Sequence, residues 1–505
     1  MFNLINPKQK SPLSRKETYV WKSPYACKVH NSILDFVGNT PLVKLNRIPK
    51  DYGLSCEIYA KCEFMNPSGS SKDRIALAML KDAEQGGYIN DDTEFVEATS
   101  GNTGISVALS ATLLGKKAHI IMSDKNSAEK VNTMRALGAD VVVTTKSPMQ
   151  LAREIKDAHP DTVVMLDQFE NSANPKVHYD TTGMEIIDAL GKVDALVSGV
   201  GTGGTLSGAG HRIKEKYPKC LIVVAEPEGS TMFNVHSKNH SFLVEGIGGS
   251  NIPIVMDKSI VSDYEVVSDE ESFLMAREVI QKEGLLCGGS SGAIMAAAIK
   301  TARKNKLGAG HRIVVVLPDG MRNYMTKFVT DQWMEAHLFM DPPKHTMRWW
   351  TKPINDLTLT HTYPIITDAY TCSEALSEMK NVNIAIVANS KGWFVGAISK
   401  DNFRNLATNP TKLPSQNSEE FNFNDPVTDH LIKDCYKLAK NGKKGMPTIG
   451  LLSRMLDITP FVVIGQNIYD SEEDHFLPES VATGDDILDY IFSFNNKDQR
   501  YTNLI

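Results

Sequence analysis

The chain has 505 residues, more than one hydrophobic core usually organises, so two or three domains are expected. Hydrophobic residues make up 42% and charged residues 23%, a balance typical of globular proteins and not of disordered ones. The formal net charge is −6, so the composition offers no basic surface for nucleic acid or an anionic membrane.

The cysteines and the N-terminal residues indicate where the protein resides. Seven cysteines, an odd number at irregular spacing and without a C-x-x-C pair, favour reduced thiols over a disulfide framework or a zinc site. The first 28 residues are polar and basic, unlike a secretory signal. No apolar run reaches the about 18–20 residues of a membrane span. A cytoplasmic protein without membrane or nucleic-acid partners is therefore expected.

The first 340 residues predict an irregular arm followed by an α/β body. Residues 1–30 contain Pro7, Pro12 and Pro24, which interrupt helices. From 31 to 340, short β-branched runs alternate with glycine- or serine-rich turns and helix-period segments, which predicts parallel sheets with right-handed crossovers. Ligands bind such sheets beyond the carboxyl ends of the strands. The clearest runs are Thr93–Ala98, Ala118–Met122, Asp194–Ser198, Leu221–Ala225 and Arg312–Leu317.

The rest of the chain predicts a linker and a smaller domain. Residues 341–360 are proline-interrupted, and the pair Trp349 and Trp350 is expected to dock this linker onto a neighbouring surface. Residues 361–505 contain strand and helix patterns whose order partly recurs after residue 441. Two tandem α+β units of this kind are typical of a regulatory or dimerising domain.

Lys72 is the most informative single residue. It ends the segment Asn-Pro-Ser-Gly-Ser-Ser-Lys, residues 66–72, at the start of a helical pattern. The positive end of a helix disfavours the charged ammonium, and the neutral amine is the form that makes a Schiff base with an aldehyde cofactor. Taken alone, the residue also fits a solvated surface lysine.

Three further segments predict anion and ring contacts. Thr99–Gly104 follows a strand and presents backbone N–H groups that suit a carboxylate, and Gly199–Thr205 is a glycine loop that suits a small phosphate. The glycine loop lacks the Gly-Lys-Ser/Thr ending of a nucleotide P-loop. Cys287–Gly292 places Ser290 as a neutral partner for a heterocycle nitrogen. Each segment alone also fits a turn selected for packing, but their common order argues against coincidence.

Together these segments resemble the fold-type II, tryptophan synthase β-like, family of pyridoxal 5'-phosphate (PLP) enzymes over residues 31–340. Within it they are most similar to the cystathionine β-synthases, and residues 361–505 are similar to the tandem CBS motifs of a Bateman module. The resemblance implies a PLP-dependent α/β body with two parallel-sheet lobes. The segments that carry it are Lys61–Phe64, Leu166–Phe169, His178–Thr182, Glu283–Gly289 and Leu317–Phe328.

The resemblance also implies the roles of individual residues. Lys72 would bind the cofactor aldehyde and later accept the α-proton of the substrate, Asn102 would contact the 3-oxygen, and Ser290 the ring nitrogen. No metal is implied. The implied phosphate contacts are Gly201, Thr202, Gly203, Gly204 and Thr205; the substrate-carboxylate contacts are Thr99, Ser100, Thr103 and Gln168; and Gly246 and Tyr324 would lie on the second-substrate side.

The implied reaction is a β-replacement that condenses L-serine with L-homocysteine to cystathionine and water, with hydrogen sulfide released when cysteine replaces serine. A cysteine synthase using O-acetylserine and sulfide would share the cofactor contacts and is the main alternative. A serine or threonine dehydratase, a catalytically inactive nucleotide-sensing regulator and a heme-type gas sensor are the others.

The chain departs from the family pattern in three places. Animal members carry a heme on the N-terminal arm, but Ser23-Pro24 is followed here by Tyr25 instead of histidine, so heme is not expected even though Cys27 and His30 lie nearby. Gly249 stands where a tyrosine is usual.

The third departure lies in the C-terminal domain, which resembles modules that bind S-adenosylmethionine. Thr483–Asp486 keeps the ribose-binding pattern, while Val382–Ala385 lacks the usual acid and amide. Residues Asn441–Lys444 and an insertion over Tyr469–Pro478 further alter its surroundings. A weak or absent response to S-adenosylmethionine and a homodimer are therefore expected.

Overall fold

The computed structural model describes residues 29–99, 101–123, 127–144, 147–235, 239–341, 347–359, 362–408, 421–433, 435–442, 446–469 and 474–502. Ser100, Ser23-Pro24 and Cys27 lie outside the described residues, as does nearly all of the expected arm. Among the helices in these ranges, none is both long and apolar enough to cross a membrane.

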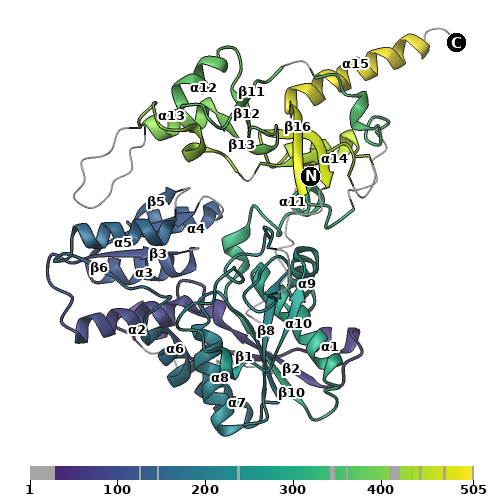
Figure 1. The fold of residues 1–505 in the computed structure, drawn as a ribbon. Coiled ribbons are helices and arrows are strands. Elements are labelled where there is room, and N and C mark those ends of the chain that lie inside the picture. The colour runs from purple at the N-terminus through teal and green to yellow at the C-terminus, as the bar shows by residue number, and fades with distance from the viewer. Residues whose placement is uncertain are drawn as a thin grey trace, which may run out of the picture.

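The body contains two sheets, one in each lobe (Figure 1). The larger has the order β1 (Leu42–Lys44), β2 (Glu57–Cys62), β10 (Arg312–Leu317), β7 (Ala195–Gly199), β8 (Leu221–Pro227) and β9 (Asp263–Val267). Only β1 within it runs antiparallel to its neighbour. The smaller is wholly parallel, in the order β5 (Asp140–Thr144), β4 (Lys117–Ser123), β3 (Glu94–Ala98) and β6 (Val163–Met165).

Helices connect these strands, as the alternating pattern predicts. They are α1 (Ile48–Asp51), α2 (Lys72–Gln85), α3 (Asn102–Leu113), α4 (Ala128–Ala136), α5 (Pro148–Ala158), α6 (Ala173–Val177), α7 (Gly183–Leu190), α8 (Gly204–Lys216), α9 (Asp269–Glu283), α10 (Gly289–Lys304) and α11 (Asp331–Ala336). Short 3₁₀ turns include η3 (Glu63–Met65) and η6 (Met321–Tyr324), and the π-helical turn η4 (His178–Thr182) joins α6 to α7.

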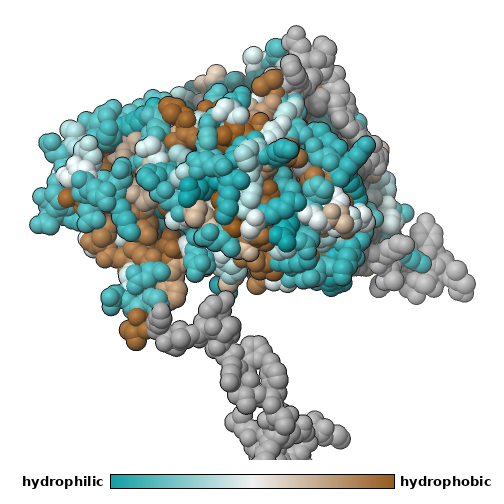
Figure 2. Space-filling model, turned by 90° about the horizontal axis from the view of Figure 1, so that it is seen from below, coloured by the Kyte–Doolittle hydropathy of each residue, from teal (hydrophilic) through white to brown (hydrophobic). Residues whose placement is uncertain are grey.

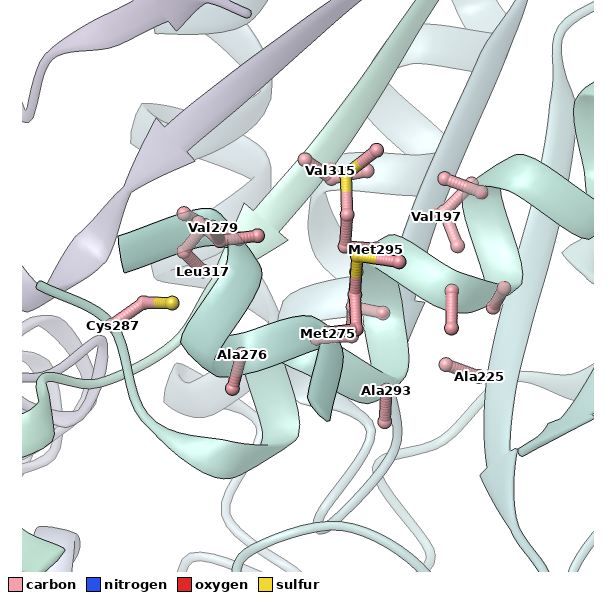
Figure 3. Packing of buried hydrophobic residues seen from close by; sticks show 14 of the residues in the cluster. Val197, Ala225, Met275, Ala276, Val279, Cys287, Ala293, Met295, Val315 and Leu317 are labelled. Carbon is pink, nitrogen blue, oxygen red and sulfur yellow. The ribbon is translucent and has the colours of Figure 1, made fainter. Parts of the chain in front are cut away.

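The core of the larger lobe fixes the helix α10 against the sheet. Met275 and Val279 from α9 and Met295 from α10 pack near Val315 and Val197 of the strands (Figure 3). These strands are buried, which explains their continuous apolar runs instead of alternation. The packing holds the start of α10, and with it Ser290, in a fixed place relative to the strand ends.

The C-terminal domain contains two units of the same topology. In the first, β11 (Ile365–Thr367) pairs parallel with β12 (Ile384–Ala388), which pairs antiparallel with β13 (Phe394–Ser399). In the second, β14 (Lys437–Ala439), β15 (Phe461–Tyr469) and β16 (Asp474–Thr483) repeat that order and those directions. The helices are α12 (Cys372–Glu378), α13 (Lys400–Thr408), α14 (Ile449–Leu456) and α15 (Gly484–Thr502). The expected tandem α+β repeat is confirmed.

The segment between the two domains packs as expected for its tryptophans. Trp349 and Trp350 are buried against Ile449 at the start of α14. Ala336, which lies within the predicted body, and Ile354 belong to the same buried cluster as α14. The transition between body and C-terminal domain is therefore a shared core, and it begins a few residues before the sequence pattern changes.

Candidate active site

Three of the segments singled out in the sequence follow the carboxyl ends of strands in the two sheets, and the fourth lies between α9 and α10. Lys72 begins α2 after β2, Asn102 begins α3 after β3, and the glycine loop joins β7 to α8. Asp319, two residues after β10, links the segments of Lys72, Asn102 and Ser290. Ser70 and Asp319 form an isolated β-bridge, and the Gly288 N–H donates to the Asp319 carbonyl at 2.9 Å. Segments more than 200 residues apart in the chain thus meet.

The electrostatic environment of Lys72 favours a neutral amine. Burial lowers the pKa of Lys72, and the nearby charge of Lys130 acts in the same direction. Asp319 and Glu63 oppose this shift without reversing it. The position at the first residue of α2 adds the positive end of the helix. A lowered pKa and a place at the start of a helix make Lys72 the candidate nucleophile and base.

Asn102 is held in one orientation by two side chains. Its Nδ2 donates to Asp319 Oδ2 at 2.8 Å, and its Oδ1 accepts from Asn323 Nδ2 at 3.0 Å. Tyr324, buried, donates its hydroxyl to the same Asp319 oxygen at 2.6 Å. Asp319 is 1% exposed, and burial raises its pKa. The predicted cofactor contact and the predicted second-substrate residue therefore share one carboxylate.

A cluster of charges continues from Tyr324. Lys130 Nζ lies 3.2 Å from the Tyr324 hydroxyl, 4.6 Å from its ring centroid and 2.6 Å from Glu245. Lys327 pairs with the other oxygen of Glu245. Burial tends to raise the pKa of Glu245, but the two ammonium groups outweigh it and the pKa is lowered. This ionised cluster lies directly before Gly246, on the side predicted for the second substrate.

The glycine loop has the close approaches that require glycine. A Cβ at Gly201 would lie 2.4 Å from the Gly246 carbonyl, so the loop touches the segment predicted for the second-substrate side. Gly203 has a φ of +85°, and a Cβ at Gly204 would lie 1.9 Å from Asn174 Oδ1. That oxygen is buried and has no hydrogen-bond partner among the described residues. The loop thus brings backbone N–H groups to the start of α8, an arrangement suited to phosphate.

Hydrogen bonds join the predicted phosphate and carboxylate contacts. Asn174 Nδ2 donates to Thr202 Oγ1 at 3.1 Å and to the Gln168 carbonyl at 2.7 Å. Thr103 in turn donates to Gln168 Oε1 at 2.6 Å. Thr205 lies 3.1 Å from Nε2 of His178, a buried histidine whose pKa burial lowers to about 3. His178 is therefore neutral at physiological pH.

The remaining predicted residues lie where their motifs place them. Thr99 Oγ1 accepts from the Gly101 N–H at 3.0 Å, within the turn before α3. Ser290 is buried in the first turn of α10. Ser100 is not described. Gly249, where a tyrosine was expected, binds Ser230 through its N–H at 2.9 Å.

Sequence reasoning missed several polar residues that hold the predicted ones. They are Glu97, Lys130, Asn174 and Glu245; Asp319 and His178 lie in segments that carry the resemblance but were given no role. For Asp319 the sequence contained a signal, because it follows the apolar run Arg312–Leu317 at the edge where ligands bind. The other residues have no local sequence signal, because they meet their partners only once the chain has folded.

These residues fit PLP. The cofactor needs an unprotonated lysine, anion donors for its phosphate and a polar partner for its ring, and the structure supplies Lys72, the loop 201–205 and Ser290. The orphaned Asn174 oxygen faces the same loop, where a phosphate-bound water or hydroxyl would satisfy it. Among the described residues, no cluster of metal-ligating side chains occurs.

A family model described as a pyridoxal-phosphate dependent enzyme matches residues 33–319, and the chain belongs to this class of enzymes. The chain is 38% identical over 480 residues to a cystathionine beta-synthase of Apis mellifera, covering 90% of this chain and 91% of that one. It is 39% identical over 464 residues to the cystathionine beta-synthase of Mus musculus, with 88% and 79% covered. Within the PLP-dependent enzymes it therefore belongs to the cystathionine β-synthase family.

Two solved structures resemble the body. One is a hydrogen sulfide-producing enzyme from Fusobacterium nucleatum, 40% identical with a TM-score of 0.56, which covers 59% of this chain and 99% of its own. The other is an O-acetylserine-dependent cystathionine beta-synthase from Helicobacter pylori, 35% identical with a TM-score of 0.56, covering 60% and 99%. The expected fold-type II body is confirmed.

Proposed function

We propose that the protein condenses L-serine with L-homocysteine to cystathionine and water, using PLP, and that it releases hydrogen sulfide when cysteine replaces serine. The observation that carries the proposal is the lysine at the start of α2, whose pKa burial lowers and whose surroundings are joined through Asp319 to Asn102 and Tyr324. The relatives named cystathionine beta-synthase over nine-tenths of the chain support it.

In this proposal the chain holds the cofactor from three sides. Lys72 would bond its aldehyde, the backbone and hydroxyls of residues 201–205 would hold its phosphate, and Ser290 would contact its ring nitrogen. The second N–H of Asn102 would be available to the 3-oxygen. When bound, PLP supplies an electron-withdrawing ring that acidifies the α-C–H of an attached amino acid.

The protein side chains then act on the substrates. Thr99, Ser100, Thr103 and Gln168 would orient the carboxylate of serine, and Lys72 would accept the α-proton at Nζ. Ser290 would offer the ring nitrogen a neutral hydroxyl instead of a carboxylate. Gly246, Tyr324 and the ionised cluster of Lys130 and Glu245 border the place where homocysteine adds.

The test is product formation by the purified, PLP-loaded protein. We expect cystathionine, identified by mass spectrometry, from serine and homocysteine. Lys72→Ala should lower the rate by at least about 10²-fold, because the variant lacks the base. Asp194 contacts the opposite end of β10, through the N–H of Arg312. The control variant Asp194→Asn should therefore retain activity.

The donor substrate distinguishes this reaction from its main alternative. An O-acetylserine-dependent relative of known structure makes that donor worth testing beside serine. Cysteine formation from O-acetylserine and sulfide, with no product from serine, would overturn the proposal in favour of a cysteine synthase.

We further propose a cytoplasmic homodimer without heme. The face seen in Figure 2 has hydrophobic patches among hydrophilic residues, and the described residues include several exposed large apolar side chains, such as Phe36, Met65 and Ile254. A dimer would cover some of this surface. Light scattering of the purified protein measures its assembly state. A Soret band in the visible spectrum would contradict the proposed absence of heme.

A further inference from the structure

Asp319 has more contacts to the candidate site than any role assigned so far requires. Its Oδ2 accepts from Asn102 Nδ2 at 2.8 Å and from the Tyr324 hydroxyl at 2.6 Å. Its main-chain carbonyl accepts from the N–H of Gly288, and its neighbour Pro318 accepts from the N–H of Ser71 at 2.8 Å. One short segment after β10 therefore touches the lysine segment, the asparagine segment and the serine segment.

The carboxylate fixes which atoms of Asn102 are free. Oδ2 accepts from the Tyr324 hydroxyl and from Asn102, so it selects the amide nitrogen of Asn102, while Asn323 donates to the amide oxygen at 3.0 Å. One N–H of Asn102 is then left to donate. Without Asp319 the amide could rotate and present its oxygen, which cannot donate to a phenolate oxygen.

The same carboxylate fixes the direction of the Tyr324 hydroxyl. Because that O–H donates to Asp319, its oxygen lone pairs face Lys130 Nζ, which lies 3.2 Å away. Lys130 also pairs with Glu245 at 2.6 Å, directly before Gly246. Asp319 therefore orders the second-substrate side through Tyr324 as well as the cofactor side through Asn102.

The glycine at position 288 leaves room for this carboxylate. A Cβ at Gly288 would lie 2.0 Å from Asp319 Oδ1 and 2.8 Å from Tyr324 Cε2. Oδ1 itself is buried without a hydrogen-bond partner among the described residues. A buried carboxylate oxygen left unsatisfied costs free energy, so its retention calls for a reason beyond packing.

We propose that Asp319 is a positioning residue for the reaction, which orients Asn102 toward the cofactor and Tyr324 toward the second substrate through one shared oxygen. The proposal rests on the proposed function for the substrates, but its cofactor half stands on PLP binding alone. It concerns geometry: the acceptor at the Oδ2 position matters more than the negative charge.

Two substitutions separate geometry from charge. Asp319→Asn removes the charge and keeps an acceptor oxygen that both donors can reach, whereas Asp319→Leu has a similar shape and removes the acceptor. We expect D319L to weaken PLP binding and to raise the KM for homocysteine, each by about 10-fold or more. D319N should recover most of both losses. Asp194→Asn, which loses a carboxylate bonded to the Arg312 N–H at the opposite end of β10, should match the wild type.

The readouts are PLP titration of the cofactor-free protein, followed by the visible absorbance of the bound cofactor, and KM and kcat for each substrate. Equal impairment of D319N and D319L would overturn the proposal, because the carboxylate would then act by charge. Wild-type values in both variants would overturn it too. Should D319L not fold, Tyr324→Phe removes one donor alone; it should raise the homocysteine KM and leave PLP affinity unchanged, and an unchanged KM would refute the Tyr324 half.

Failure of the proposed function gives a different pattern. In that case wild-type protein forms no cystathionine, yet the PLP affinities of D319L and D319N still separate if Asp319 positions Asn102.

Discussion

Glu97 shows how a single buried residue supports the candidate site through the backbone of a neighbouring turn. It is 0% exposed and accepts the backbone N–H groups of Asp167 at 3.0 Å and Gln168 at 3.3 Å. Asp167 has a φ of +49°, a conformation that costs energy for a residue with a side chain. Glu97 stabilises this turn, and the turn presents Gln168 to Thr103.

Substitution of Glu97 should change how stability depends on pH. Burial raises the pKa of Glu97 to about 8, above its ordinary 4.5, so folding favours the protonated acid. Its contribution to stability is therefore complete below pH 4.5 and is lost as the pH rises from 4.5 through about 8. Glu97→Gln cannot titrate. We expect the melting temperature of the wild type, relative to that of E97Q, to fall between pH 5 and pH 8.

Thermal unfolding of both proteins across that pH range measures the effect, with Glu94→Gln, a partly exposed acid on the same strand, as the control. Parallel curves for wild type and E97Q would contradict a raised pKa. The slope of the melting temperature with pH follows from the titration of Glu97 alone. It does not depend on how stable E97Q is on average.

At the scale of single residues, the sequence predicts the residues that belong to motifs. It misses the residues whose contribution is to hold the motif residues in position. Lys72 is visible because a serine- and glycine-rich turn precedes it. Asp319 and Asn102 are 217 positions apart, so no local pattern shows that they bond. Glu97 resembles any residue of a strand, because its burial follows from the sheet that forms around it.

At the scale of elements, several helices of the body begin with glycine because another chain segment lies against their first turn. Gly204 begins α8, and a Cβ there would lie 1.9 Å from Asn174 Oδ1. Gly484 begins α15, where a Cβ would meet nothing within 4 Å. The two positions provide a matched pair of glycine-to-alanine substitutions.

Gly204→Ala should weaken cofactor binding, while Gly484→Ala should leave it unchanged. Displacing Asn174 to admit the methyl group costs about 1–3 kcal/mol, and it also disturbs the hydrogen bond to Thr202. PLP titration of the two cofactor-free variants measures the difference. Equal PLP affinities of the two variants would show that the glycine loop accommodates the methyl group without a loss of binding.

The sequence predicts the elements well where the hydrophobic period is clear. The runs at 93–98, 118–122, 194–198, 221–225 and 312–317 all lie in strands, with ends shifted by one or a few residues. The segment Tyr469–Pro478, interpreted as an insertion, instead includes the end of β15 and much of β16, which pair as long antiparallel strands. The polar residues around Phe476 hide the pattern, although Phe476 itself is buried in a cluster that includes Phe461 and Val463 of β15.

At the scale of the whole molecule, the C-terminal domain is fixed to the body by packing and charge. Arg454 of α14 pairs with Glu335 of α11 at 2.8 Å, and the His337 ring lies 5.2 Å from that of Tyr436. Figure 1 shows α11 between the body and this domain. A response to a ligand in the C-terminal domain would have to pass through this shared core.

The pattern Thr483–Asp486 is the remaining feature that suggests such a ligand. Asp486 is 0% exposed, and its Oδ2 accepts from both the N–H of Thr483 at 2.8 Å and its hydroxyl at 2.9 Å. These bonds cap the start of α15. A ribose would have to displace them, which costs about 0.5–2 kcal/mol for a helix cap.

We therefore expect S-adenosylmethionine to change cystathionine formation by less than about twofold, since the binding energy is opposed by loss of the cap. Activity and melting temperature with and without the ligand measure this, for the wild type, Asp486→Asn and the exposed neighbour Asp485→Asn. A large stimulation that D486N abolishes and D485N keeps would show that the carboxylate binds ribose after all. Without stimulation, D486N should still lower the melting temperature more than D485N, because only Asp486 caps the helix.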